Sequence, residues 1–190
     1  MMFDLKVAVN RSEKGFTLIE LVMVIVILGI IGVVALPKFM DFKKDARIAK
    51  LHEIAASLKA AVNLAHTKAV MLNVPKEGNP RIDIDGIGQG VLFRFQYPYA
   101  NANGIKQWID MDIKGWGRTN DNTKNELVSN GATSAFFPGR PAYNITFGEL
   151  TGNGSQGGST TAPQHTHCFV QYANATATDT PKVTIVTTGC

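Results

Sequence analysis

Residues 21–36 read LVMVIVILGIIGVVAL, a run without a single polar side chain. Extended back through Glu20 and Thr17 to Phe16, the run reaches the roughly 20 residues that span a bilayer. Its Leu, Val and Ile residues do not alternate with polar ones, as a half-exposed strand would require. A helix of this length would be about 31 Å long. We therefore expect a membrane-spanning helix.

The composition is that of an ordered protein, with 45% hydrophobic and 18% charged residues in a chain of 190. The net charge of +4 is small, and the basic residues are not interleaved with aromatic ones in a block. Nucleic acid is therefore not expected as the primary partner. The two cysteines, Cys168 and Cys190, form no Cys-x-x-Cys pair, and a single disulfide in an oxidising compartment is the natural interpretation.

The segment before the apolar run, MMFDLKVAVNRSEKG, is polar and ends in Gly15. An ordinary secretory signal places its apolar region before the cleavage site, whereas here that region follows. Cleavage after Gly15 would remove the polar segment and leave the apolar helix on the mature protein. The alternative is an uncleaved signal anchor with a short cytoplasmic tail. In either case a disulfide requires the C-terminal part to lie outside the cytoplasm.

The stretch from Gly15 to Glu20, GFTLIE, together with the apolar run that ends at Pro37, resembles the N-terminal signature of type IV pilins and pseudopilins. The following sequence PKFMDFKKDARIA, residues 37–49, is most similar to the mannose-sensitive haemagglutinin pilin branch. The resemblance implies a leader of residues 1–15, cleavage between Gly15 and Phe16 by a prepilin peptidase, and methylation of the Phe16 amine. It also implies extraction from the bacterial inner membrane into an extracellular helical filament.

Glu20 is the one carboxylate in the predicted membrane helix, and a charge there needs a partner. Cleavage would create one, because the new α-amine of Phe16 would be cationic at neutral pH. A pair between Glu20 and the Phe16 amine of a neighbouring subunit would neutralise both charges and fix the axial register of the filament. Alternatively, Glu20 lies near the lipid headgroups or pairs with the amine of its own chain.

Gly29, Gly32 and Pro37 admit two interpretations. Small residues allow close packing of membrane helices, and Pro37 can simply mark the exit from the bilayer. The second interpretation is that the stretch from Gly29 to Pro37 unwinds under packing or tension, since the resemblance places all three residues where pilin helices loosen in the filament. Because Pro37 removes a backbone hydrogen bond and disfavours helix at Leu36, we favour this second interpretation.

Residues 16–36 are thus the membrane and assembly half of a long helix, and residues 37–72 are predicted as its amphipathic half. Apolar residues in the second half recur at spacings of three and four: Leu51, Ile54, Ala55, Leu58, Ala61, Val62, Ala65, Ala69 and Leu72. The opposite face carries Lys50, Glu53, Lys59, Asn63 and His66. We expect the apolar stripe to cover a sheet, with a connecting loop over residues 73–90.

The globular head is expected over residues 91–190, with strands in VLFRFQY from Val91, QWIDMDI from Gln107, YNITFGE from Tyr143, CFVQYA from Cys168 and KVTIVT from Lys182. The predicted fold is α+β, a long N-terminal helical spine packed on an antiparallel β-sheet, as in pilins. A disulfide between Cys168 and Cys190 would bound a region, 168–190, that in the resembled family is exposed and often carries antigenic or adhesive contacts.

Other candidate chemistry is weaker. A dinucleotide-like pattern at Gly152, Gly154 and Gly157 lacks the strand-turn-helix context that a phosphate site requires. His165 and His167 have no evident acidic partner with which to bind a metal. Ordinary turns explain the oxygen-rich Asp83, Asp85 and 120–122 better than a calcium site does.

Trp116 could cover a sheet edge or bind sugar. Asn144 and Asn174 begin glycosylation-type sequences. No nucleophile and base pair is evident, so neither an enzyme nor a cofactor is expected.

We expect the structural subunit of a type IV pilus, a homopolymer that serves attachment or motility. Its other partners would be the prepilin peptidase, the pilus assembly machinery, the inner membrane before assembly, and a surface or carbohydrate ligand. Two alternatives remain: a pseudopilin of a type II secretion system, and a monomeric, membrane-anchored carbohydrate-binding module. A calcium site in the head would favour the pseudopilin, whereas the cysteine pair and the sizeable head favour the pilin.

Overall fold

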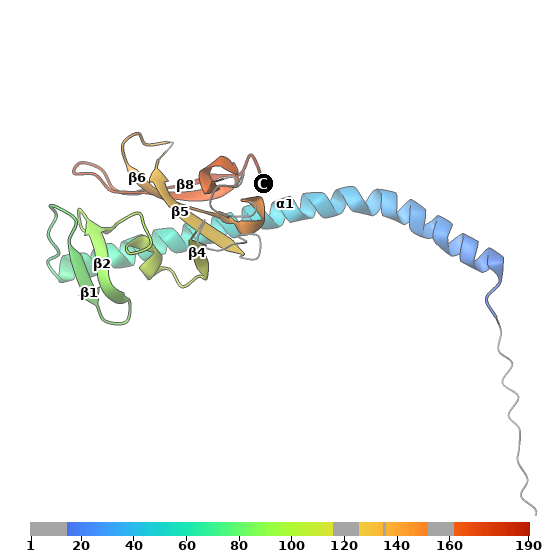
Figure 1. The fold of residues 1–190 in the computed structure, drawn as a ribbon, viewed down its shortest axis with the longest axis horizontal. Helices are drawn as coiled ribbons and strands as arrows, with labels where there is room; N and C mark the ends of the chain where they lie inside the picture. The colour runs from blue at the N-terminus through green and yellow to red at the C-terminus, as the bar shows by residue number, and fades with distance from the viewer. Residues whose placement is uncertain (1–14, 116–125, 135, 152–161) are drawn as a thin grey trace, which may run out of the picture. The chain divides into compact units, whose positions relative to one another are not determined.

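The structure, a computed structural model, describes residues 15–115, 126–134, 136–151 and 162–190. It divides into two units that meet at Lys43 and Lys44. One helix, α1 (Leu18–Met71, 54 residues), contributes its first part to one unit and its second part to the other (Figure 1).

The first part of α1 is apolar and uncovered. Every large apolar side chain from Leu18 to Val34 is exposed. The segment Leu18–Ala35 is long and apolar enough to cross a membrane. So much exposed apolar surface on one helix requires lipid or other helices around it, in agreement with the sequence prediction.

The second unit holds two sheets. The smaller contains β1 (Arg81–Ile84), β2 (Gly88–Arg94) and β3 (Tyr97–Pro98), in that order. The larger has the order β4 (Ile113–Gly115), β5 (Leu127–Thr133), β6 (Pro141–Phe147), β7 (Phe169–Ala173) and β8 (Lys182–Val186). Neighbouring strands are antiparallel except β4 and β5, which are parallel. Among the described residues, the head also contains the short 3-10 helices η1 (Ile105–Trp108), η3 (Gly148–Leu150) and η4 (Pro163–His165).

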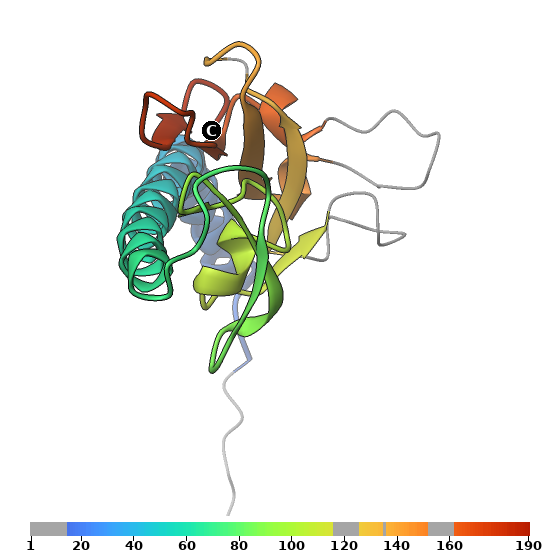
Figure 2. The same ribbon diagram turned by 90° about the vertical axis from the view of Figure 1, so that its left-hand side faces the viewer.

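The core of the head lies between α1 and the larger sheet (Figure 2). Leu51, Ile54 and Leu58 of α1 are fully buried together with Val170 and Tyr172 of β7. A second cluster packs Ala65 and Ala69 of α1 against the smaller sheet, through Ile84, Val91 and Phe93. The predicted apolar stripe is therefore the buried face of the helix. Leu72 is the exception, because it is 46% exposed and Val74 is buried in its neighbourhood instead.

Buried tyrosines tie the sheet to its surroundings. The Tyr172 hydroxyl donates a hydrogen bond to the carbonyl of Pro98, at 2.6 Å, and so connects the two sheets. The Tyr143 hydroxyl lies 2.5 Å from the hydroxyl of Ser129 on the neighbouring strand. Burial raises the pKa of both tyrosines, which therefore stay neutral over the physiological range.

Polar side chains form one row of cross-strand neighbours on the larger sheet. Asn130, Asn144 and Gln171 lie opposite one another on β5, β6 and β7; Asn144 and Gln171 are buried, and Asn130 is half-buried. The Gln171 amide donates to Asn144 at 2.7 Å, and Asn144 donates to Asn130 at 3.3 Å. Because each buried amide finds a partner, the row fixes the register of three strands without leaving these groups unsatisfied.

Three secondary-structure expectations were wrong. The expected loop over residues 73–90 contains β1 and the start of β2, because Ile82 and Ile84 alternate with polar residues and pair across a turn with β2. The expected strand from Gln107 is instead a 3-10 turn followed by an irregular segment. In this stretch Ile105 and Ile109 are buried while Gln107, which a strand would place on the same face as both, is exposed. Finally, the predicted α+β fold is confirmed, but the larger sheet is not antiparallel throughout, because β4 runs parallel to β5.

Candidate functional site

The start of α1 carries the single carboxylate of the apolar segment, and that carboxylate is already hydrogen-bonded. Thr17 precedes the helix and Glu20 lies in its first turn. The Glu20 carboxylate accepts hydrogen bonds from the Thr17 backbone N–H, at 2.8 Å, and from its hydroxyl, at 2.9 Å. The Glu20 N–H points back to the Thr17 hydroxyl at 3.4 Å. This reciprocal arrangement is a capping box.

The capping box was missed in the sequence, although the signal was present. Thr17-Leu18-Ile19-Glu20 fits the pattern of Ser or Thr followed three residues later by Glu or Gln. Both amine partners proposed for Glu20 require cleavage before Phe16, so in this single, uncleaved chain they stay predictions. The carboxylate also lies at the positive end of the helix dipole, which favours a negative charge.

The helix is unbroken through the three residues expected to loosen it. Gly29, Gly32 and Pro37 all lie within α1. A side chain added at Gly29 or at Gly32 would meet nothing within 4 Å. The glycines therefore leave the helix surface open to close approach by another helix.

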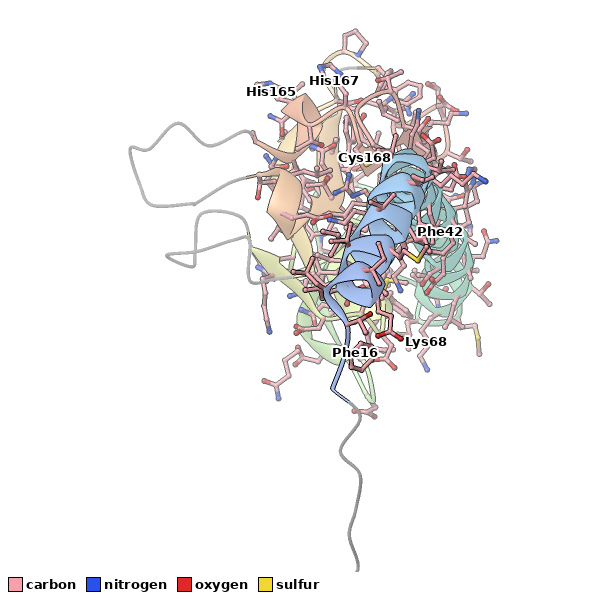
Figure 3. All side chains as sticks on the ribbon, turned by 90° about the vertical axis from the view of Figure 1, so that its right-hand side faces the viewer. Phe16, Phe42, Lys68, His165, His167 and Cys168 are labelled. Atoms are coloured by element: carbon pink, nitrogen blue, oxygen red, sulfur yellow. A yellow bond between two sulfur atoms is a disulfide. The ribbon has the colours of Figure 1, made fainter. Side chains whose placement is uncertain are left out.

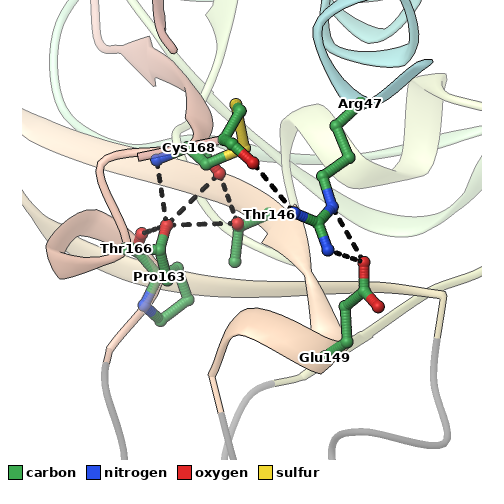
Figure 4. Close-up of a disulfide and its surroundings, with 7 residues drawn as sticks. Arg47, Thr146, Glu149, Pro163, Thr166 and Cys168 are labelled. Carbon is green, nitrogen blue, oxygen red and sulfur yellow. Dashed lines mark hydrogen bonds and ion pairs between the residues drawn. A yellow bond between two sulfur atoms is a disulfide. The ribbon is translucent and has the colours of Figure 1, made fainter. Parts of the chain in front are cut away.

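Cys168 and Cys190 form the predicted disulfide, with their Cα atoms 4.8 Å apart (Figure 4). The Cys168 carbonyl accepts a hydrogen bond from the hydroxyl of Thr146, and the Cys168 N–H donates to the Thr166 hydroxyl at 3.2 Å. On the other side, the Gly189 N–H donates to the carbonyl of His167, at 2.7 Å. Hydrogen bonds around the disulfide thus connect β6, the residues that follow η4 and the segment that follows β8.

Arg47 of α1 forms hydrogen bonds to residues beside the disulfide. Its Nε and Nη2 donate to one oxygen of Glu149, at 2.9 and 2.7 Å, and its Nη1 donates to the Cys190 carbonyl, at 2.8 Å (Figure 4). Arg47 was not singled out in the sequence. No local pattern could reveal its role, because its partners lie more than 100 residues further along the chain.

Comparison with known proteins finds similarity that is most specific in the N-terminal segment. The family model of the prokaryotic N-terminal methylation motif matches residues 10–36. A type IV major pilin protein, PilE1 of Neisseria gonorrhoeae, is 44% identical over 121 residues, which cover 57% of this chain and 65% of that protein. These similarities support the prediction of a type IV pilin. The finer resemblance to the mannose-sensitive haemagglutinin branch stays a prediction.

Two further relatives are similar to this chain. Another PilE1 sequence of the same organism is 32% identical over 63% of this chain, and PilA5, a major component of the narrow type IV pilus of Thermus thermophilus, is 45% identical over 30% of it. The chain spans 52% and 65% of the length of the two PilE1 relatives, and 48% of PilA5. No solved structure matches it significantly.

The remaining candidate sites gain no support. His165 and His167 lie in the segment that leads to Cys168 (Figure 3), but within the described ranges no group of three or more His, Cys, Asp or Glu side chains could hold a metal ion. Asp83 accepts the Gly90 N–H at 2.6 Å and so serves a turn. Asn144 and Asn174 are buried, so a glycan could not be carried by either in this fold. The patterns at 120–122, at Trp116 and at Gly152, Gly154 and Gly157 lie outside the described residues.

Proposed function

We propose that this chain is the structural subunit of a type IV pilus, and that it polymerises through the first part of α1. The observation that carries the proposal is the exposed apolar helix with one carboxylate in its first turn. The two PilE1 relatives are named as major pilins, and a head with its own core would remain outside the helical bundle.

Processing is the first step of the proposed function. A prepilin peptidase would cleave between Gly15 and Phe16, and the new amine of Phe16 would be methylated. Gly15 is exposed, and a Cβ added to it would meet nothing within 4 Å, so the bond is accessible in this conformation. Before cleavage the subunit would reside in the bacterial inner membrane, and afterwards it would join an extracellular filament with the help of the pilus assembly machinery.

Assembly then requires Glu20 to exchange partners. In the single chain the carboxylate is held by Thr17, which supplies hydrogen bonds but no positive charge. A cationic Phe16 amine of a neighbouring subunit would supply both, and among apolar helices such a pair would be lost if the register slipped by one turn. The capping box would thus hold Glu20 until the pair with the neighbour forms.

Loosening of the helix between Gly29 and Pro37 belongs to the same step. Pro37 lacks a backbone N–H, so the helix has one hydrogen bond fewer at this point even while it is continuous. We infer that packing in the filament unwinds this segment, whose glycines have the lowest helix propensity of the ordinary residues around them. Attachment or motility would be the use of the filament, with the head facing outward.

The direct test is the N-terminal sequence of the subunit in purified surface filaments. The proposal predicts filaments built mainly of this chain, each copy beginning with methylated Phe16. Filaments that lack the chain, or a surface-exposed chain that still begins at residue 1, would overturn it. A minor fraction of this chain in filaments built mainly of another subunit would also overturn the proposed role.

A further inference from the structure

The head has a groove between the helix and the edge strand β8 that the proposed filament role does not use. A cavity of about 460 Å³ lies between α1, β3 and β8, and a second cavity of about 260 Å³ is lined by the loop that precedes β8. Tyr97 and Thr180 line both cavities, so the two are neighbours. The larger volume falls within the range of small-molecule sites, about 300 to 1,000 Å³.

Cations dominate the groove. Lys59 and Lys182 line the larger cavity and Lys76 the smaller one, whereas Asp179 is the single acidic residue among the described residues that line either. Asp179 is already paired with Arg140, at 2.6 Å, and with Lys182, at 3.1 Å. Lys59 forms no ion pair with any residue that the structure describes. The groove is therefore suited to an anionic ligand.

Aromatic rings at the centre of the groove are held in place. The Tyr97 ring stacks on His66 of α1, with centroids 4.1 Å apart and planes at 7°. His66 in turn bonds the carbonyl of Gln96, at 3.1 Å, and the Gln96 amide donates to Val74 at 3.0 Å. Phe95 and Gln96 both have positive φ, 53° and 65°, a strained choice for residues other than glycine. The turn that presents Tyr97 is thus fixed from both sides.

Groups that both donate and accept hydrogen bonds complete the lining. They are the hydroxyls of Thr176, Thr178, Thr180 and Thr184 and the amide of Asn63. Sugar hydroxyls likewise donate and accept, whereas the oxygens of a phosphodiester backbone only accept. Aromatic rings offer a flat apolar surface to the apolar face of a sugar ring. These features favour an acidic saccharide over a nucleic acid, although a cationic groove with aromatic rings can also bind single strands.

We propose that this groove binds an oligosaccharide that carries carboxylates. The carboxylate would pair with Lys59 and Lys182, a sugar ring would lie against Tyr97, and its hydroxyls would bond the threonines and Asn63. The site lies wholly in the unit after Lys44, so binding does not depend on assembly of the filament.

The test uses the full chain, solubilised as a monomer in detergent, so that a failure of filament assembly cannot affect it. The probes are the hexamer of β-1,4-linked glucuronic acid and cellohexaose, which differ at C6 of each ring, and binding is followed by saturation-transfer NMR titration. We expect the acidic hexamer to bind and cellohexaose to bind at least about threefold more weakly. Equal binding of the two hexamers, or no binding of the acidic one, would overturn the proposal.

Two lysine variants separate a site from general charge attraction. Lys59→Gln should weaken binding of the acidic hexamer by about threefold to fivefold. Lys68→Gln is the matched control, because Lys68 is also exposed on α1 but lies nine residues later, on the opposite side of the helix and outside both cavities. It should bind as the wild type does. Equal losses in the two variants, or tighter binding of a single-stranded DNA hexamer than of the acidic hexamer, would contradict a saccharide site.

Discussion

The carboxylate of Glu20 accepts hydrogen bonds from both the backbone N–H and the hydroxyl of Thr17 in its own chain, at 2.8 and 2.9 Å. A charge placed in a membrane helix is expected to find a partner, and here the nearest one is three residues away. The pair with a neighbour's amine, which we propose for the filament, therefore has an intrachain competitor. The strength of the capping box sets how readily Glu20 leaves it.

Replacing Thr17 tests the capping box. Thr17→Val keeps the shape of the side chain but removes the hydroxyl, so the first turn of α1 should open more often. We expect the Glu20 amide to exchange about fivefold faster than in the wild type, measured by hydrogen exchange of the full chain in detergent. Thr17→Ser is the control and should exchange like the wild type. Identical rates in the Val and Ser variants would show that the hydroxyl is not used.

Removal of the disulfide should destabilise the head. The bond closes a segment with a sequence separation of 22 residues, which corresponds to about 3 kcal/mol in the chain-entropy model. We expect the double variant Cys168→Ser, Cys190→Ser to unfold at a lower temperature, monitored by circular dichroism. Reductant should lower the melting temperature of the wild type and leave the double variant unchanged. A wild type that is indifferent to reductant would count against a stabilising bond.

Gly189 is a sharper probe of the same region. A Cβ at this position would lie 2.2 Å from the carbonyl oxygen of Thr166 and 2.9 Å from the Cβ of His167. Gly189→Ala must therefore push the chain away from η4, at a cost of about 1 to 3 kcal/mol in the free energy of unfolding. Gly131→Ala, where the added Cβ meets nothing within 4 Å, is the control and should have a much smaller effect. Equal stability of both variants would contradict the close approach.

The ion pair of Asp179 makes part of the stability depend on pH. Its hydrogen bond from Arg140, and next that from Lys182, lower the pKa of the Asp179 carboxyl below its ordinary value. Because the folded-state pKa is the lower one, the contribution is present at neutral pH and is lost as the pH falls through that value. Asp179→Asn should melt below the wild type at pH 7, and the difference should shrink by about pH 2. If the two melting temperatures still differed by as much in acid, the loss of stability would come from altered packing and not from the lost charge.

The sequence predicts the helical part of this fold well, because its evidence is periodic. The apolar run from Leu21 to Leu36 and the buried stripe around Leu58 each repeat a pattern over many residues. β5 was missed because its sequence, LVSNGAT, contains the Ser-Asn-Gly combination that usually marks a turn. Contacts with neighbouring strands place β5 in the sheet instead, including the side-chain hydrogen bond between Asn144 and Asn130.

Some residues of the candidate sites can likewise be recognised in the sequence, whereas others are brought together only by the fold. Glu20, Cys168 and Cys190 stand out in the sequence because a lone charge in an apolar run and a lone cysteine pair are rare. Arg47 does not stand out, since its partners Glu149 and Cys190 are brought to it only by the fold. The groove around Tyr97 is likewise assembled from segments far apart in the chain. Neither local spacing nor composition contains that information.

The most direct test of the central claim is the number of surface filaments formed by variants of Glu20. Glu20→Gln retains an acceptor for Thr17 but not the charge, and Glu20→Ala removes both. Asp41→Ala alters an exposed carboxylate on the same helix beyond the Leu18–Ala35 segment and serves as the control. We predict that both Glu20 variants are processed after Gly15, yet lose about tenfold or more of their filaments, while the control assembles normally. Normal filament numbers in Glu20→Gln, with normal processing, would contradict the proposed charge pair between subunits.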